Sequence, residues 1–356
     1  MKLTISKSEL QSSLAGPARI ASGAMTAELA CVKLEASDGF LSFEATDGDR
    51  SMKLSAAALV DKPGAALLPA RRLLDTVKTL PDEAVEVSVS SGSAAVKCGK
   101  SVFRLPALGT LDFPGFPEVE PEQTLAVPHF LFAEMAKTVL PFAAKDGVKS
   151  DHPILQGVHV ELDGGTLRMV ATDSFHVGCT EFKVDACGEF STVLPAGFVS
   201  EAASSECQGD AVISSSARQV KMEFGGVTIA SRLVEGRFPG WRRIVPETID
   251  SRAVFDKGEV MGAIRMCSAA SGGKMPIAIS YDGGTSTFSC ADDEGSAVSH
   301  IDCECEGAGS VKCSIKMLED AVRAVDADEV AIGLAGSLQP MIVTGGTCLN
   351  VVMPMR

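Results

Sequence analysis

The sequence is poor in aromatic residues and in positive charge. Aromatic residues make up 5% of its 356 residues, with a single Trp and a single Tyr, so its cores must be built mainly from aliphatic side chains. Its 46 acidic residues outnumber its 32 basic residues, which gives a formal net charge of −14. Proteins that hold duplex DNA by attraction alone usually carry a basic surface. This balance therefore argues against a free-standing electrostatic binder of nucleic acid.

Long apolar runs are missing as well. No stretch of about 18 apolar residues occurs, so we expect no membrane-spanning helix. The first ten residues carry Lys2, Lys7 and Glu9 and lack the apolar core of a signal peptide, which predicts a cytoplasmic protein. The 11 cysteines, an odd number in a long chain, are then expected to be reduced.

The motifs of common enzymes are also absent. The sequence contains no phosphate-binding GxxxxGK[ST] loop and no GxGxxG, HExxH or GxSxG motif. Cys303 and Cys305 have no second pair of ligands at zinc spacing. We therefore predict a protein that is not an enzyme and has no catalytic residue, metal or cofactor. The enzymatic alternative is a metal site formed by Asp47, Asp173 and Asp292, which requires these three residues to converge.

What the sequence does contain is one pattern repeated three times. A turn followed by alternating strand residues occurs at positions 38–47, 163–173 and 282–292, at a spacing of roughly 120 residues. The Asp-Gly pair that opens each copy is expected to supply the two positive-φ residues of a tight hairpin. Because Thr-Asp recurs in two copies, we interpret it as a turn, and His176 as a loop residue rather than half of an acid–base pair with Asp173.

Helix signals recur on nearly the same period. Ser6 with Glu9, and Asp256 with Glu259, have the spacing of capping boxes, and Pro128 is predicted at the first position of the corresponding middle helix. A second helix is predicted later in each copy, after residues 68–70, after residues 194–196 and from residue 314. Further strands are predicted after these helices, at residues 85–90, 211–214 and 329–334.

Each copy therefore has the order helix, strands, helix, strands over roughly 110–125 residues, which is the size of a whole domain. The predicted fold class is α+β. Polar or proline-containing stretches near residues 120–123 and 246–251 separate the copies. We expect three domains, at residues 1–121, 122–248 and 249–356.

Two segments stand out from the repeat. Residues 237–246 place the only Trp, Trp241, beside Arg242 and Arg243 and between prolines, as in a linker packed on its neighbours or in a binding segment. The chain ends in an apolar, Met-rich stretch at 351–356. This stretch is either the last strand of the third domain or an adaptable binding surface, and one segment can be both.

These two segments, the Ala-Thr-Asp turn at 171–173 and the threefold plan resemble the beta subunit of bacterial DNA polymerase III, the sliding clamp family, over the whole chain. The resemblance implies three clamp-type domains per chain, each with two helices packed on antiparallel sheets. Two chains would form a six-domain homodimeric ring around duplex DNA, as a processivity factor for DNA polymerase. A ring is retained topologically, so weak, sequence-independent phosphate contacts suffice despite the negative charge. The alternative is a three-domain adaptor that does not encircle DNA.

The resemblance also implies a cleft between domains two and three. DNA polymerases and clamp-loader subunits would dock there through a short apolar peptide of the form Gln-Leu-x-Leu-Phe. After the Thr-Asp turn the family commonly has Gly-His-Arg, whereas this chain has Ser174-Phe175-His176. The positions that match or line the cleft are Leu155, Thr172, Ser174, Phe175, His176, Val177, Pro239, Arg243, Ile244, Leu338, Pro340, Val351, Val352, Met353, Pro354, Met355 and Arg356.

Two further sets of residues follow from the resemblance. The first set is expected to face DNA from the hole of the ring and consists of Arg71, Arg72, Lys149, Lys316 and Arg323. The second set is expected at the dimer interface. There the edge strand containing Phe103 and Leu105 would pair with the partner chain near Ala269 and Ala270, because an unpaired strand edge is a liability.

Overall fold

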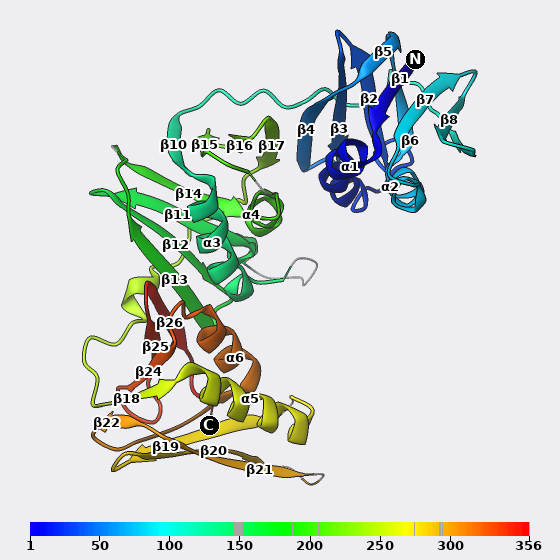
Figure 1. Ribbon diagram of the computed structural model, residues 1–356. Helices are drawn as coiled ribbons and strands as arrows, with labels where there is room; N and C mark the ends of the chain where they lie inside the picture. Colours follow the sequence, from blue (N-terminus) through cyan, green and yellow to red (C-terminus); the bar gives the residue numbers. More distant parts are fainter. Residues whose placement is uncertain are drawn as a thin grey trace. The chain divides into compact units, whose positions relative to one another are not determined.

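The structure is a computed structural model that describes residues 1–145, 152–186, 188–205, 207–273, 275–291, 293 and 295–355. The chain separates into two compact units. Unit 1 contains residues Met1–Phe130 and Glu201–Leu233, and unit 2 contains residues Leu131–Ser200 and Val234–Arg356. Both units mix helices with antiparallel sheets, so the fold is α+β as predicted (Figure 1).

Unit 1 holds two antiparallel sheets. The first has the order β5 (Leu59–Lys62), β1 (Lys2–Ser6), β7 (Ala84–Ser90), β8 (Ser93–Cys98) and β9 (Ser101–Pro106). The second has the order β10 (Gln123–Pro128), β15 (Asp210–Ser215), β16 (Gln219–Phe224), β17 (Val227–Arg232), β4 (Arg50–Ala57), β3 (Phe40–Thr46), β2 (Cys31–Ser37) and β6 (Gly64–Pro69).

Unit 2 also holds two antiparallel sheets. The larger has the order β14 (Phe190–Pro195), β11 (Gly157–Asp163), β12 (Thr166–Thr172), β13 (His176–Lys183), β26 (Cys348–Val352), β25 (Met341–Gly345), β24 (Glu329–Leu334), β18 (Ser251–Asp256) and β22 (Glu304–Glu306). The smaller has the order β21 (Ser296–Asp302), β20 (Thr285–Ala291), β19 (Pro276–Asp282) and β23 (Gly309–Ser314).

The helices begin close to the predicted signals. They are α1 (Lys7–Ala21), α2 (Ala70–Thr79), α3 (His129–Val139), α4 (Ala196–Ala203), α5 (Lys257–Ser271) and α6 (Ile315–Ala324). The Ser6 hydroxyl and the Asp256 carboxylate accept the backbone N–H groups three residues on, at 3.2 and 2.9 Å, which confirms both residues as helix N-caps. The prediction for Pro128 was wrong, because it ends edge strand β10, where a residue without an N–H is tolerated.

Apolar residues spaced three or four apart seat the paired helices on the sheets. Helix α2 buries Leu73 and Val77, and α6 buries Leu318 and Val322. Figure 1 shows α1 beside α2 in unit 1 and α5 beside α6 in unit 2. The opposite faces of α2 and α6 are left to solvent and carry charged side chains.

The threefold repeat is visible in the strand order. The sheets β5-β1-β7-β8-β9 and β4-β3-β2-β6 of the first copy correspond, strand for strand, to β22-β18-β24-β25-β26 and β21-β20-β19-β23 of the third. Each copy also starts with a strand, β1, β10 or β18, that the sequence pattern did not predict. These strands have only five or six residues and run directly into a helix cap, so their alternation is too brief to recognise.

The hairpin turns differ in detail from the prediction. Asp38 and Gly39 form the first turn, with φ angles of 48° and 83°, as expected. In the second and third copies the turns are Gly164-Gly165 and Gly283-Gly284, while Asp163 pairs with Thr166 inside the ladder. The Asp-Gly prediction was therefore right only for the first copy. Two consecutive glycines move the positive-φ pair one residue along the chain.

Neighbouring copies are joined by the same strand pairing. The last strand of the second copy, β17, pairs with β4 of the first, with Ser231 opposite Arg50. The last strand of the third copy, β26, pairs with β13 of the second, with Val352 opposite His176. Arg50 and His176 occupy equivalent positions after the Thr-Asp turns, so the two joins also share their register.

Candidate functional site at the β13–β26 junction

The C-terminal tail is tied down at the join between β13 and β26. After the last ladder pair, the Met353 N–H donates to the Phe175 carbonyl at 3.0 Å, and the Met355 N–H donates to the Lys312 carbonyl at 2.7 Å. Pro354 forms an isolated bridge with Cys313. The tail is therefore both the final strand of its domain and an extended segment held on the surface beside the second copy.

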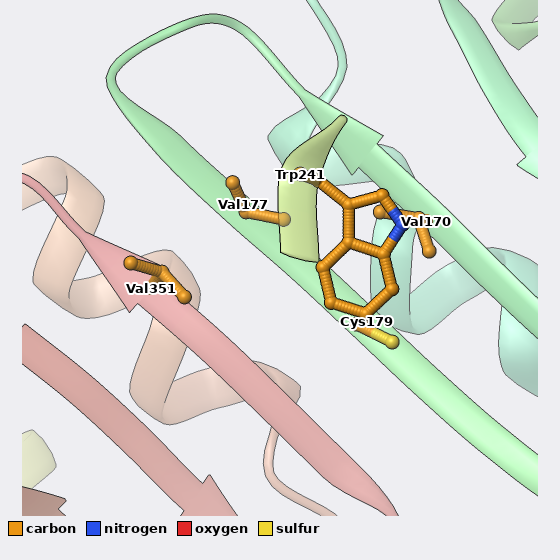
Figure 2. Packing of buried hydrophobic residues seen from close by; sticks show 5 residues of the cluster. All are labelled: Val170, Val177, Cys179, Trp241 and Val351. Atoms are coloured by element: carbon orange, nitrogen blue, oxygen red, sulfur yellow. The ribbon is translucent and has the colours of Figure 1, made fainter. Parts of the chain in front are cut away.

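The single Trp packs against this join. Trp241 begins a short 3-10 helix, η3 (Trp241–Arg243), and is 7% exposed. Figure 2 shows its indole beside Val170 and Cys179, with Val177 and Val351 completing the cluster. Ile244 packs against the same cluster and is half-buried. The cluster shows that residues 237–246 are a linker packed on its neighbours.

An ion-pair network holds the linker on the sheet. The Arg242 guanidinium lies 4.8 Å from the centre of the Trp241 ring and donates to Glu161 at 3.0 Å. Burial alone would raise the pKa of Glu161, but the hydrogen bond and charge of Arg242 outweigh it and lower the pKa. His159, whose ring stacks on Phe238, has a lowered pKa because burial disfavours its charged form.

The predicted cleft residues separate into a buried base and an exposed rim. Ile244, Pro340 and Pro354 are half-buried between these two groups. The buried residues are Leu155, Thr172, His176, Val177, Val351 and Val352. The exposed residues are Ser174, Phe175, Pro239, Arg243, Leu338, Met353 and Met355. Arg356 lies outside the described residues.

The β13–β26 ladder and the Trp241 cluster contain five of these positions, His176, Val177, Ile244, Val351 and Val352. The backbone contacts of the tail add Phe175, Met353, Pro354 and Met355. Leu155, Pro239, Arg243, Leu338 and Pro340 take part in none of these contacts. We use the name junction surface for Phe175, Ile244, Met353 and Met355, the exposed or half-buried apolar residues that the ladder, the tail and the cluster connect. Sequence reasoning missed Val170 and Cys179 in the base, although alternation along β12 and β13 places them on the same face as Thr172 and Val177.

The Thr-Asp turn beside the junction surface has a structural role, as predicted. The Thr172 hydroxyl donates to the His176 carbonyl at 2.8 Å, and the Asp173 carboxylate accepts the backbone N–H groups of Phe175 and His176, both at 2.9 Å. Thr46 and Asp47 make the same type of contacts in the first copy. Both Asp residues therefore organise separate turns.

His176 takes the place of an arginine in this turn. In the first copy Arg50 binds the Asp47 carboxylate, whereas here His176 Nδ1 lies 2.7 Å from Asp173 Oδ1. Burial alone would raise the pKa of Asp173, but the ring and the backbone N–H donors outweigh burial and lower it. On its other side, His176 Nε2 lies 4.0 Å from Asp320 Oδ2 on α6. His176 and Asp173 thus form a compact structural contact in the second copy.

One residue of this turn is strained. Ser174 has a φ of 80°, whereas the equivalent residue of the first copy is Gly48, with a φ of 101°. We expect Ser174→Gly to raise the free energy of unfolding by about 1 kcal/mol, because glycine adopts positive φ without a Cβ penalty. Urea denaturation followed by circular dichroism measures the change. The matched control is Gly48→Ser, which should lower the free energy of unfolding by a similar amount. Equal stability of Ser174→Gly and the parent chain would contradict the strain argument.

Four of the five residues predicted to face DNA lie on the second helix of their copies. Arg71 is 79% exposed and pairs with Asp75, 3.3 Å away, and Arg72 is also exposed. Lys316 and Arg323 also form ion pairs within their own helix, α6: Lys316 binds the buried Asp320 at 2.6 Å, and Arg323 pairs with Glu319. Lys149 lies outside the described residues, as does the whole loop 146–149.

The residues predicted at the dimer interface lie at a sheet edge and on a helix. Phe103, 38% exposed, and Leu105, 8% exposed, are on β9, which ends its sheet. Ala269 and Ala270 are in the last turn of α5 and so offer no strand edge themselves. The sheet edge nearest to them is strand β21. Gly295, just before β21, lies close to Ala270: a Cβ atom added to this glycine would be 3.0 Å from the Ala270 carbonyl oxygen.

The enzymatic alternative requires Asp47, Asp173 and Asp292 to converge. Asp47 and Asp173 lie in different units, and Asp292 is outside the described residues. Within the described part of the chain, no three His, Cys, Asp or Glu side chains gather closely enough to hold a metal ion. None of the helices in that part combines the length and the apolar character needed to cross a membrane.

Known proteins match most or all of this chain. Family models described as the N-terminal and central domains of the DNA polymerase III beta subunit match residues 1–117 and 129–240. The chain is 27% identical to the beta sliding clamp of Streptomyces coelicolor, over 100% of this chain and 99% of that protein. It is 26% identical to the beta sliding clamp of Staphylococcus aureus, over 91% of each.

Solved structures share the fold. The DNA polymerase III beta subunit of Thermotoga maritima has a TM-score of 0.92 at 24% identity, and the sliding clamp of Bacillus subtilis has 0.90 at 23%. The sliding clamp of Pseudomonas aeruginosa bound to griselimycin has a TM-score of 0.91 at 24% identity. Each alignment covers 100% of this chain and 99% of the other.

Proposed function

Because the chain belongs to the DNA polymerase III beta subunit family, the beta sliding clamps, we propose that it is a non-catalytic processivity factor that encircles duplex DNA. It would act in the cytoplasm as a homodimeric ring of six clamp domains, and it would tether DNA polymerases and clamp-loader subunits. The alternative of a non-encircling adaptor gains no support from the relatives. The observation that carries the ring is the strand pairing that recurs between successive copies.

The proposed domains are residues 1–121, 122–248 and 249–356. These bounds place each initial strand, β1, β10 and β18, at the start of a domain and each final strand, β9, β17 and β26, at its end. In both joins within the chain, the final strand of one copy pairs with the third hairpin strand of the copy before it. Applied once more, the same rule pairs β9 with β21.

Ring closure by a second chain follows from this rule. Strands β9 and β21 each end a sheet in the described part of the chain. Transferring the register of the two existing joins sets Val102 opposite Val298 and Phe103 opposite Ala297 of the partner chain. Leu105 then meets Gly295, next to Ala270. Two chains make two such joins, and a head-to-tail contact that closes produces a ring.

The junction surface is the proposed docking site for partner proteins. Its apolar side chains stand exposed over a base of buried valines, which suits a partner that inserts apolar anchors. The apolar rim favours a peptide of the Gln-Leu-x-Leu-Phe type. Leu155, Leu338 and Pro239 remain proposed contacts of the same peptide. Arg71, Arg72, Lys149, Lys316 and Arg323 remain the proposed DNA-facing set.

The proposed ring predicts a specific dimer. Light scattering at micromolar concentration should give twice the chain mass of 37.0 kDa. Phe103→Asp should yield monomers, because it puts a charge into the paired edge. The matched control is Leu59→Asp, which replaces an exposed leucine on β5, at the opposite edge of the same sheet. This variant should remain a dimer.

The register of the join can be tested by cross-linking. A chain carrying Val102→Cys and Val298→Cys should form an interchain disulfide on mild oxidation, because directly opposed residues have Cβ atoms about 4.5–5.5 Å apart. A chain carrying Val102→Cys and His300→Cys, displaced by two residues, should cross-link poorly. A monomeric parent chain, or equal cross-linking of the two variants, would overturn the proposed closure.

A further inference from the structure

Few of the methionine side chains of this protein are strongly exposed. The chain has 13 methionines, and those at the centre of its cores, such as Met135, Met169 and Met341, have no exposed surface. The strongly exposed ones among the described residues are Met25, Met266, Met353 and Met355, at 97%, 41%, 37% and 46%. Met353 and Met355 are only two positions apart in the chain, and both belong to the junction surface.

The tail presents this pair in a fixed way. Backbone hydrogen bonds from Met353 to Phe175 and from Met355 to Lys312 hold both main-chain groups, while the Pro354 bridge holds the residue between them. Residues two apart in an extended segment point to the same side. Both thioethers are thus available to a docked peptide and to small solutes.

The exposed thioethers of Met353 and Met355 are open to peroxides. Thiols react through the thiolate, and burial raises the pKa of Cys179, Cys267 and Cys313 to about 12. A thioether needs no deprotonation. The sulfoxide that it forms is polar and chiral, and it disrupts Met-rich interfaces.

We propose that Met353 and Met355 form an oxidation-sensitive pair, at which conversion to sulfoxide by a peroxide weakens partner docking. This inference rests on the proposed function of the junction surface. In each step the peroxide O–O bond breaks, one oxygen forms an S=O bond, and the other leaves as water or an alcohol. Sulfur loses two electrons and the peroxide gains them. A thiol-dependent methionine sulfoxide reductase returns the thioether and releases water and a disulfide.

The test compares peptide binding before and after treatment with hydrogen peroxide. Fluorescence polarisation with a labelled Gln-Leu-Asp-Leu-Phe peptide measures affinity, and peptide mapping by mass spectrometry measures sulfoxide at each methionine. We expect oxidation at 353 and 355 to weaken binding by about tenfold, the loss expected for one apolar anchor. Reductase treatment should restore the original affinity.

Matched variants separate this pair from general damage. A chain carrying Met353→Leu and Met355→Leu should show the same affinity before and after peroxide, measured against its own untreated value, because leucine has similar volume and cannot be oxidised. A chain carrying Met25→Leu and Met266→Leu should lose affinity as the parent does. Affinity within twofold of the original despite confirmed sulfoxides, or no sulfoxide at 353 and 355, overturns the proposal. Failure of the untreated parent to bind the peptide would instead overturn the proposed docking function.

Discussion

Loaded onto closed circular duplex DNA by a clamp loader, the protein should stay bound through repeated washing, and it should leave once the circle is cut. An intact circle would hold the ring in place, whereas the charges on its helices favour only weak direct binding to DNA. Arg71, Lys316 and Arg323 each pair with a carboxylate of their own helix, so each phosphate contact competes with an existing ion pair. With a net charge of −14, we expect direct attraction to be too weak to hold DNA.

Short linear duplex should show this weakness directly. We expect a Kd of roughly 10⁻⁴–10⁻⁶ M, the usual range of non-specific binding, that weakens steeply with salt because phosphate contacts provide the attraction. The Phe103→Asp variant is the control on circular DNA, since a chain that cannot close should be lost before any cut. Equal dissociation from intact and cut circles would refute encirclement.

Deleting residues 353–356 should lower the affinity for a Gln-Leu-Asp-Leu-Phe peptide by about 30-fold or more, or about 2 kcal/mol, which is the scale of an interface hot spot. The deletion removes Met353 and Met355 from the junction surface and two backbone hydrogen bonds. It leaves Val351 and Val352, which are buried and paired with β13. The truncated chain should therefore stay folded and dimeric, because its core is complete.

Three controls make this result specific. Light scattering should give the same mass for truncated and full chains, and denaturation midpoints should differ little. A Met25→Ser variant, which changes a fully exposed methionine in unit 1, should bind the peptide as the parent does. If the truncated dimer bound the peptide as tightly as the full chain, the junction surface would lose its assignment as the docking site.

Local signals in the sequence were good guides to local structure. Ser6 and Asp256 cap the helices that follow them, because a capping box depends on residues only three positions apart. The threefold spacing and the α+β class were also correct. The Gly-Gly turns were not predicted, because two consecutive glycines allow the turn to lie in more than one register. The first strand of each copy was missed because its alternation is too brief to recognise.

The candidate site was harder to predict because its residues come from distant segments. The resemblance predicted that Val177, Ile244 and Met355 belong to the site, but it could not predict which of them are buried in the folded chain. Val352 was expected to contact a partner, yet it is fully buried in the ladder, whereas Phe175, at the strained turn, is 60% exposed. Burial depends on how β13, β26 and the linker pack together, and sequence spacing carries no such information.

The sequence by itself determined the helix caps at Ser6 and Asp256, the approximate positions of the hairpins and the aliphatic character of the cores, since each depends on residue type or spacing over a few residues. It also determined the repetition of one α+β domain, because the same local patterns recur along the chain. Only the tertiary structure decided that β17 pairs with β4 and β26 with β13, and hence that β9 and β21 end their sheets. These pairings join residues far apart in the chain. They are selected by matching hydrogen-bonding edges and apolar faces, which exist only once the domains have folded.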